Sequence, residues 1–279
     1  MKRIICIFLA LALVLCLSAC NNSSTLNVIG NADSLVKLDD EKLKQKLNNQ
    51  KLGWQLEEPE KGEEIAVVTM QTGEVIKIRF FPDEAPKAVY NFKHHALNGY
   101  YDGLTFHRVM KNFMIQGGSP DATGTDGVSV WDQQFEDEFA DNLINLDGAL
   151  SMANAGANTN GSQFFINCSD TPFEEEAWEN YAQGFEVYKQ NPETFAATYG
   201  KWLDMDKVGD DYKALYSEHG GNPHLDGAYS TDGTGHTVFG QVFEGMDNVY
   251  KLSQVETDPQ NNKPITDVVI EKIEIVKYE

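Results

Sequence analysis

Apolar and polar residues alternate in several short runs between residue 63 and the C-terminus. Residues 65–70 form a largely apolar run and residues 75–80 an alternating one, on either side of a polar, glycine-containing turn, which predicts a β-hairpin. Residues 88–97 carry apolar side chains at helical spacing, and residues 268–278 alternate again, which predicts one helix and a C-terminal strand. Many short strands, glycine-rich turns and few helices favour a mainly β fold, specifically a closed antiparallel barrel.

The first 19 residues have the pattern of a secretory signal peptide. Two basic residues precede an apolar run of 14 residues (4–17), which is too short to span a bilayer comfortably. The run ends in the sequence LSAC at 17–20, which resembles the lipobox of bacterial lipoproteins. That resemblance implies cleavage after Ala19, attachment of lipid such as palmitate to Cys20, and an extracytoplasmic protein anchored to the cell membrane. The alternative is an ordinary signal peptide in which Cys20 has no special role.

A polar segment follows the predicted cleavage site. Residues 21–34 contain few core-forming side chains and predict a flexible tether. Four leucines at three- to five-residue spacing then predict a short amphipathic helix; they are Leu35, Leu38, Leu43 and Leu47. We therefore assign residues 20–62 to the lipidated cysteine, the tether and this helix, and residues 63–279 to one compact domain.

Charge and cysteine content exclude several classes of protein. The chain contains 22 Lys and Arg against 43 Asp and Glu, a net charge of −21, whereas nucleic-acid binding requires a basic surface. The same charge disfavours electrostatic docking on anionic lipid. Of the 4 cysteines only Cys168 lies outside the first twenty residues, which excludes a disulfide framework and a multi-cysteine zinc site.

Two segments carry the candidate chemistry. The first, FHRVMKNFMIQGG at 106–118, predicts two strands around a turn and places the cation of Arg108 among apolar and amide side chains. An arginine in a strand more often snorkels or pairs with a distant carboxylate, and that alternative stays open at this point. The second segment, 150–166, is rich in Asn, Gly, Ser and Gln. This composition suits either a loop that presents its backbone to an extended peptide or a plain polar surface loop.

Both segments resemble the signature of the cyclophilins, which are peptidyl-prolyl cis–trans isomerases. The resemblance covers about residues 63–279 and includes the sequences EAPK at 84–87, PHLDG at 223–227 and HTVFGQV at 236–242. It implies a mainly β, cyclophilin-like closed eight-stranded antiparallel barrel capped by helices. It also implies isomerisation of Xaa-Pro bonds in proline-containing peptides and in unfolded or folding secreted proteins, carried out by a monomer.

The resemblance further implies a role for each matching residue. Arg108 matches the catalytic arginine, and Gln116 matches the glutamine that holds it. Four residues match the apolar pocket for the proline ring, namely Phe113, Met114, Phe165 and Leu225. Other residues match positions that bind the substrate backbone or line the groove, namely Ala153, Asn154, Ala155, Gln163 and His236.

The chemistry expected of such a site is rotation about a bond without a covalent intermediate. A guanidinium aimed at the proline nitrogen stabilises the twisted bond more than either planar form. Because no bond forms or breaks, we expect no metal, nucleotide or other cofactor. Two other classes remain as alternatives: a holdase that binds proline peptides without turnover, and a structural envelope protein.

The chain departs from the family pattern at several places. His224 stands where many cyclophilins carry a tryptophan that contributes to cyclosporin binding, and Ser119 replaces the usual aspartate. The largest departure is an insertion at 171–223 with 11 acidic and 4 basic residues, a net charge of −7. Its aromatic residues recur at three- and four-residue spacing over 178–188 and 195–203, which predicts two amphipathic helices. These helices either pack their aromatics on the barrel or form a substrate- or partner-binding annex beside the groove.

Overall fold

The computed structural model describes residues 50–279. The signal peptide, Cys20 and the leucine-rich helix predicted from the sequence all lie within residues 1–49, outside the described residues. None of the helices in the described range is both long enough and apolar enough to cross a membrane.

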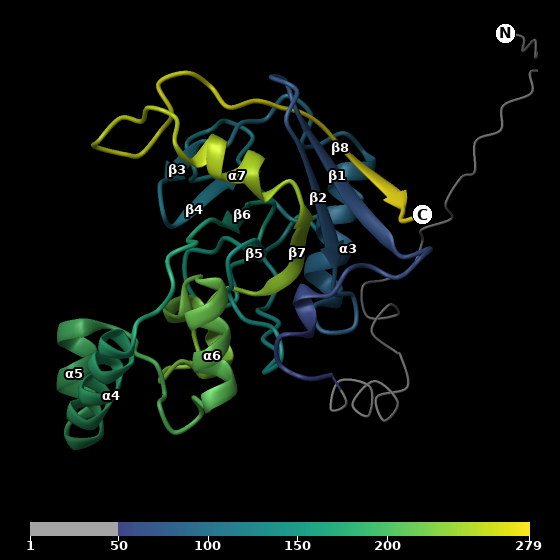
Figure 1. Cartoon of the computed structure of the whole chain (residues 1–279). Coiled ribbons are helices and arrows are strands. Elements are labelled where there is room, and N and C mark those ends of the chain that lie inside the picture. The colour runs from purple at the N-terminus through teal and green to yellow at the C-terminus, as the bar shows by residue number, and fades with distance from the viewer. Residues whose placement is uncertain (1–49) are drawn as a thin grey trace, which may run out of the picture. The chain divides into compact units, whose positions relative to one another are not determined.

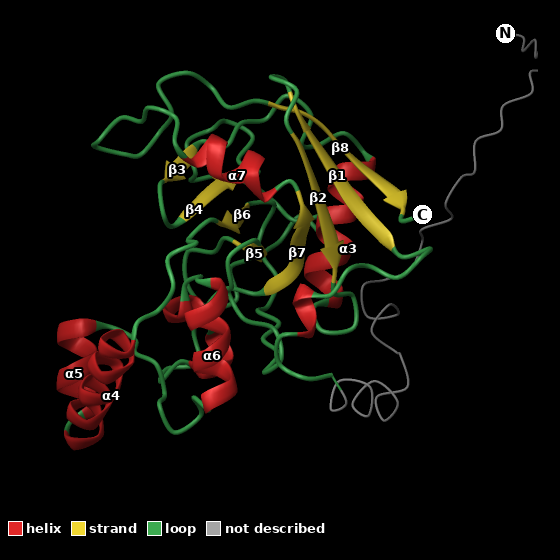
Figure 2. Ribbon diagram, in the orientation of Figure 1, coloured by secondary structure: helices red, strands yellow, loops and turns green. Residues whose placement is uncertain are grey.

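The centre of the fold is an antiparallel sheet of eight strands. In the order in which they pair, the strands are β3 (Arg108–Met110), β4 (Met114–Gly117), β6 (Phe164–Asn167), β5 (Ala149–Met152), β7 (Val238–Glu244), β2 (Val75–Phe80), β1 (Glu64–Met70) and β8 (Ile270–Lys277). The sheet curls into a half-barrel (Figure 2). Thr105 precedes the edge strand β3, and Val269 precedes the other edge strand, β8; an antiparallel bridge joins these two residues. The predicted eight-stranded antiparallel fold and its first hairpin are therefore confirmed.

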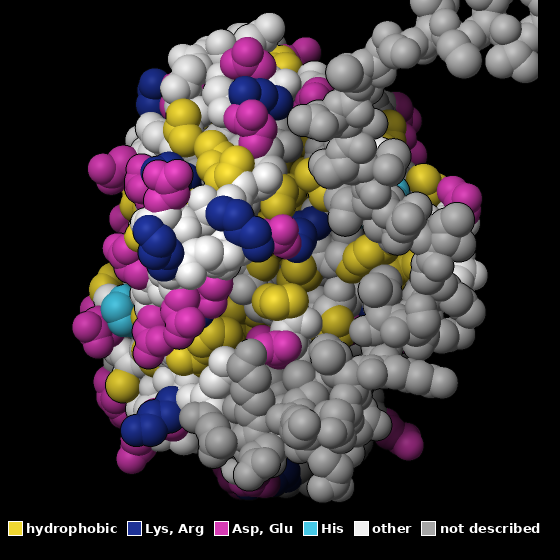
Figure 3. Space-filling view, turned by 90° about the vertical axis from the view of Figure 1, so that its right-hand side faces the viewer, with side chains coloured by type: hydrophobic (Ala, Val, Ile, Leu, Met, Phe, Trp, Pro, Cys, Tyr) yellow, Lys and Arg dark blue, Asp and Glu magenta, His cyan; other side chains and the backbone are white. Residues whose placement is uncertain are grey.

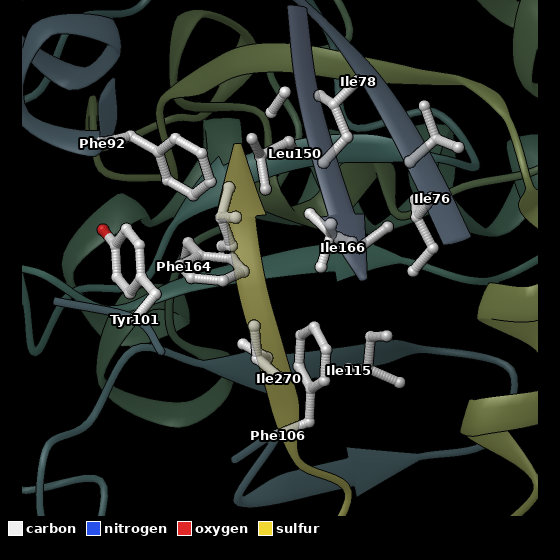
Figure 4. Close-up of a cluster of buried hydrophobic side chains, with 14 of the residues drawn as sticks. Ile76, Ile78, Phe92, Tyr101, Phe106, Ile115, Leu150, Phe164, Ile166 and Ile270 are labelled. Atoms are coloured by element: carbon white, nitrogen blue, oxygen red, sulfur yellow. The ribbon is translucent and has the colours of Figure 1, made fainter. Parts of the chain in front are cut away.

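Helices α3 (Pro86–Leu97) and α7 (Met246–Ser253) pack on the sheet and complete its apolar core. Phe92 of α3 meets Phe164 and Phe239 of the sheet at ring-centroid distances of 5.1 and 5.5 Å. In Figure 4 the core side chains of α3 and of several strands point toward one another around Phe164. Because side chains alternate along a strand, the neighbours of these core residues face the opposite side of the sheet, where they are free to build a site.

Residues ahead of β1 also pack on the barrel. The short 3-10 helix η1 (Trp54–Leu56) buries Gln55 completely, and its amide both donates to and accepts from the backbone of Ile144 at 3.0 Å. The Trp54 ring packs edge-on against Phe81 at a centroid distance of 4.8 Å. The sequence assigned residues 54–56 to the segment 20–62, ahead of the compact domain, whereas Gln55 is buried and hydrogen-bonded to Ile144 of that domain.

The insertion at 171–223, which lies wholly in the described range, contains three helices where the sequence predicted two. They are α4 (Glu175–Gln190), α5 (Pro192–Tyr199) and α6 (Asp210–His219), and Figure 1 shows α4 and α5 beside one another. The predicted second helix is wrong beyond Tyr199. Gly200 ends α5 with a φ of 75°, and the chain then extends so that Leu203 forms a β-bridge with Ser230.

Only part of the insertion packs on the barrel. Trp178, Tyr212 and Tyr216 are buried together with Ile144 and Leu146, which precede β5. Phe173 and Tyr181 pack against this cluster as well. Four further aromatic residues of the insertion contact one another instead, namely Phe185, Tyr188, Phe195 and Trp202. The interpretation that the insertion packs its aromatics on the barrel is thus confirmed for the first group alone.

The surface in Figure 3 carries many acidic side chains. They occur in several groups, with Lys, Arg and apolar side chains between them. Ion pairs neutralise some of the charge: Lys77 contacts Glu244 at 2.8 Å, and Lys272 contacts Glu274 at 2.8 Å. Exposed pairs of this kind contribute little to stability, typically about 0–1 kcal/mol each.

Candidate active site

The hairpin of β3 and β4 places two of the predicted site residues side by side. Arg108 pairs directly with Gln116 across the hairpin, so both side chains leave the same face of the sheet. The turn contains Asn112 at a φ of 58°, a left-handed conformation that asparagine adopts more readily than most residues. The turn predicted at this point of the sequence is confirmed.

The guanidinium of Arg108 is half-buried and is held without a carboxylate. One nitrogen donates to Oε1 of Gln116 at 3.2 Å, the other lies 3.1 Å from the sulfur of Met110, and the Phe113 ring centroid is 6.0 Å from Cζ. Among residues 50–279 no ion pair joins Arg108 to an acid, so nothing in this part of the chain supports the alternative of a structural ion pair. Burial lowers the pKa of Arg108 from its usual value, but a guanidinium remains protonated at neutral pH.

Two glutamine side chains form a chain of hydrogen bonds behind Arg108. The amide nitrogen of Gln116 donates to Oε1 of Gln163 at 3.0 Å, and the amide nitrogen of Gln163 donates to the Gly124 carbonyl at 3.1 Å. Because an amide oxygen only accepts and an amide nitrogen only donates, these bonds fix the orientation of both glutamine amides. The oxygen of Gln116 therefore faces Arg108, as a holder of the guanidinium must.

A pocket of about 250 Å³ with an apolar floor and polar groups at its walls opens next to the guanidinium. It is lined by nearly all of the predicted residues, namely Arg108, Phe113, Met114, Gln116, Ala153, Asn154, Phe165, Leu225 and His236. Its floor is rigid because Met114, Phe165 and Leu225 are buried against one another. The two remaining predicted residues, Ala155 and Gln163, line a neighbouring cavity of about 360 Å³ that shares Gln116, Ala153 and Asn154 with the pocket.

His236 closes one side of the pocket as a neutral ring. Its Nδ1 lies 2.9 Å from the Met152 carbonyl, and its ring meets Phe165 edge-on at 5.2 Å. A carbonyl only accepts, so Nδ1 carries the proton and Nε2 is the acceptor. Burial lowers the pKa of His236, which keeps the ring uncharged at neutral pH beside the Arg108 cation.

The polar loop that follows β5 is held in place from both ends. The Asn154 side chain donates to the Gly235 carbonyl at 2.8 Å, and the Ala153 N–H donates to the Gln163 carbonyl at 3.0 Å. The Ala155 N–H donates to the hydroxyl of Thr159 at 2.8 Å. Ala153 and Asn154 of this loop line the pocket, whereas residues 155–158 are exposed.

Sequence reasoning missed a buried carboxylate that supports the pocket wall. Asp226 follows Leu225 and accepts hydrogen bonds from the hydroxyls of Tyr212 and Tyr216, both at 2.6 Å, and from the backbone and side chain of Asn145. Burial raises the pKa of Asp226 to about 6, although these four bonds favour the charged form. The sequence signal that could have indicated this cluster is the i, i+4 spacing of Tyr212 and Tyr216, which places both side chains on one face of a helix.

Other reactive groups do not form a second centre near this pocket. Among the described residues, no cluster of three or more His, Cys, Asp or Glu side chains is placed to hold a metal ion. Cys168 is a buried free thiol, and burial raises its pKa to about 12, so the reactive thiolate is scarce. The one thiol of the domain is therefore a packing residue.

Comparison with known proteins identifies relatives along most of the chain. A proposed peptidyl-prolyl cis-trans isomerase of Staphylococcus saprophyticus is 41% identical over 218 residues, which cover 77% of this chain and 94% of the relative. A counterpart of Staphylococcus aureus is 43% identical over 214 residues, covering 76% of this chain and 92% of the relative.

Solved structures and a family match agree with these relatives. A cyclophilin type peptidyl-prolyl cis-trans isomerase of Cryptosporidium parvum superposes with a TM-score of 0.54 at 26% identity, covering 78% of this chain and 99% of that chain. A second structure of that protein, in the presence of the dipeptide Ala-Pro, gives a TM-score of 0.53 at 26% identity and covers 77% of this chain and 99% of that chain. Residues 67–275 match the family described as cyclophilin type peptidyl-prolyl cis-trans isomerase/CLD, and the chain belongs to that family.

Proposed function

We propose that this peptidyl-prolyl cis-trans isomerase uses Arg108 as its catalytic residue and the adjoining apolar pocket as its proline site. The observation that carries this proposal is a half-buried guanidinium with no acidic partner among the described residues, held by Gln116 at 3.2 Å beside the pocket. A cation that forms no ion pair within residues 50–279 and borders a pocket is suited to contact a substrate.

The uncatalysed barrier explains what such a cation does. Rotation of a peptide bond costs about 18–20 kcal/mol because the nitrogen lone pair is shared with the carbonyl. At the twisted transition state this sharing is lost, and the proline nitrogen becomes a hydrogen-bond acceptor. A guanidinium N–H directed at that nitrogen stabilises the twisted form selectively, and selective stabilisation is what lowers a barrier.

The other site residues hold one end of the bond while the other rotates. Phe113, Phe165 and Leu225 enclose the proline ring, and the backbone of Asn154 holds the residue before the proline. No covalent bond changes, so the reaction requires no proton transfer, and the neutral His236 serves as a wall of the pocket.

Replacement of Arg108 by alanine tests this assignment. We expect kcat/KM for Xaa-Pro peptides to fall by about 100-fold, since one lost charge-stabilising donor typically costs that much. Binding of the same peptides should persist, because the apolar pocket remains. The matched control is Lys111→Ala, which removes an exposed cation from the same hairpin and should leave turnover unchanged. Unchanged turnover in Arg108→Ala, or absent turnover in the intact protein, would contradict the assignment and favour a holdase.

We also propose that the enzyme acts outside the cytoplasm on secreted or envelope proteins, held at the membrane by lipid on Cys20. The lipobox-like sequence at 17–20 and the polar tether after it support this location. Labelled palmitate should enter the wild-type protein and be absent from Cys20→Ala, which should leave the membrane fraction. If both forms stay in the membrane fraction, the signal peptide is uncleaved and serves as the anchor. If both forms leave it, the signal peptide is an ordinary one and Cys20 carries no lipid.

A further inference from the structure

A second cleft opens between the insertion and the edge of the proline pocket. It has a volume of about 270 Å³, and its lining includes Ala177 and Tyr181 of α4, Lys201 and Trp202 of the segment after α5, and the exposed His224. The cleft is therefore made largely by the insertion, the part of the chain that departs most from the family pattern.

His224 connects this cleft to the proline pocket. Its ring stacks on Phe113, a pocket residue, at a centroid distance of 5.8 Å and an interplanar angle of 23°. The next residue, Leu225, is itself a wall of the pocket. The cavity that contains Gln163 meets the pocket through a different set of residues, Gln116, Ala153 and Asn154. The pocket thus has a neighbouring cavity at each of two sides.

The walls of the cleft are fixed before any ligand binds. The indole N–H of Trp202 donates to the Tyr181 carbonyl at 2.9 Å, which ties the segment after α5 to α4. Trp202 and Thr231 also bond each other through backbone and hydroxyl groups at 2.9 and 3.1 Å. A Cβ at Gly184 would stand 2.5 Å from the indole, so only glycine lets α4 approach this closely. A preformed cleft loses little entropy on binding.

We propose that this cleft binds a bulky apolar side chain, preferably an aromatic one, on the carboxyl-terminal side of the proline in the same substrate chain. The inference rests on the function proposed above, in which the backbone of Asn154 holds the residue before the proline. A chain that enters past Asn154 and seats its proline in the pocket leaves on the side of Phe113 and His224, where the cleft begins.

Size and chemistry select the occupant. An apolar cavity of about 150 Å³ already holds benzene, so a cleft of about 270 Å³ accommodates an aromatic side chain. Tyr181 and Trp202 offer aromatic surface to such a ring. Lys201 donates to the Thr234 carbonyl at 3.3 Å and forms no ion pair within residues 50–279, so its ammonium is available for a cation–π contact.

The test compares short and long peptides that share one Xaa-Pro bond. The short peptide ends just after proline, and the long ones carry tryptophan or alanine at each position from the second to the fifth residue after it. We expect one tryptophan position to raise kcat/KM about tenfold over its alanine counterpart, mainly through KM. Turnover of the short peptide reports on the isomerase site separately, so failure of that site and failure of the cleft give different results.

Two variants of α4 identify the cleft as the source of the preference. Ala177→Phe fills the cleft and should reduce the tryptophan-to-alanine ratio to about one. Ala182→Phe adds the same ring at an exposed position of the same helix and should keep the ratio. Thermal unfolding of both variants checks that the insertion is folded.

The proposal is overturned if wild type shows no tryptophan-to-alanine ratio above one, if the preference lies before the proline, or if Ala177→Phe retains the preference while folded. A partner captured through the insertion but indifferent to the groove also overturns it.

Discussion

At the scale of single residues, the position of Arg108 depends on two amides that never touch the substrate bond. Gln116 holds the guanidinium, and Gln163 orients Gln116 through a hydrogen bond of 3.0 Å. Without Gln163, the Gln116 amide could turn and present its NH₂ group to the cation. Gln163 is therefore a positioning residue for the guanidinium in addition to lining the groove.

We predict that Gln163→Leu lowers kcat roughly tenfold, because misplacement of a catalytic group by a fraction of an ångström is costly. KM should change less, since the proline pocket is intact. Gln163→Glu keeps an oxygen that accepts from Gln116 and should recover part of kcat, which a purely structural defect would not permit. Measurement of kcat and KM for both variants tests this prediction. Gln71→Leu, at an exposed turn, is the control, and equal losses in all three variants would refute the prediction.

At the scale of elements, α6 supports a wall of the proposed proline pocket through hydrogen bonds to Asp226. Tyr212 and Tyr216 of this helix donate to Asp226, and Asp226 adjoins Leu225 in the pocket wall. Asp226 is thus one of the points at which the insertion is bonded to the rest of the domain, and it needs these donors because an unsatisfied buried charge is strongly destabilising.

We predict that Tyr216→Phe destabilises the fold by about 1.5–3 kcal/mol, the value of one hydrogen bond to a charged group. KM for short proline peptides should rise, because Leu225 loses its support. Chemical denaturation and peptide kinetics measure the two effects. Tyr199→Phe removes a hydroxyl from a residue that is 65% exposed and should do neither. A Tyr216→Phe variant with wild-type stability would show that the three remaining bonds suffice.

The same elements show what sequence could and could not supply. An apolar run, a turn and an alternating run predicted the first hairpin, and alternation predicted the C-terminal strand, because alternate side chains of a strand face the core. The aromatic spacing over 195–203 suggested a helix throughout, but Gly200 ended it, and the backbone pairing of Leu203 with Ser230 joins residues too far apart for a local pattern to detect. The site residues followed from a family signature, whereas the Asp226 cluster depends on tertiary contacts with Asn145 and α6.

At the scale of the whole molecule, buried titratable groups make stability depend on pH in two opposing directions. Burial raises the pKa of Asp226 to about 6, so its contribution to stability falls as pH rises toward that value. Burial lowers the pKa of His95 to about 4. His95 therefore becomes protonated near pH 6.5 in the unfolded chain but only near pH 4 in the folded chain. Because the unfolded state binds more protons in this range, stability falls as pH decreases from 6.5 to 4.

A histidine variant separates these two trends. The buried His95 ring stacks near Tyr100 and places Nε2 3.1 Å from the Val128 carbonyl, a contact that the amide of His95→Gln can retain. We predict that the stability advantage of wild type over His95→Gln shrinks by roughly 1–2 kcal/mol between about pH 7 and pH 5, because only wild type must exclude the proton. Denaturant unfolding at several pH values measures it, with His219→Asn as the more exposed control. A constant difference would mean that the folded protein accepts a proton at His95.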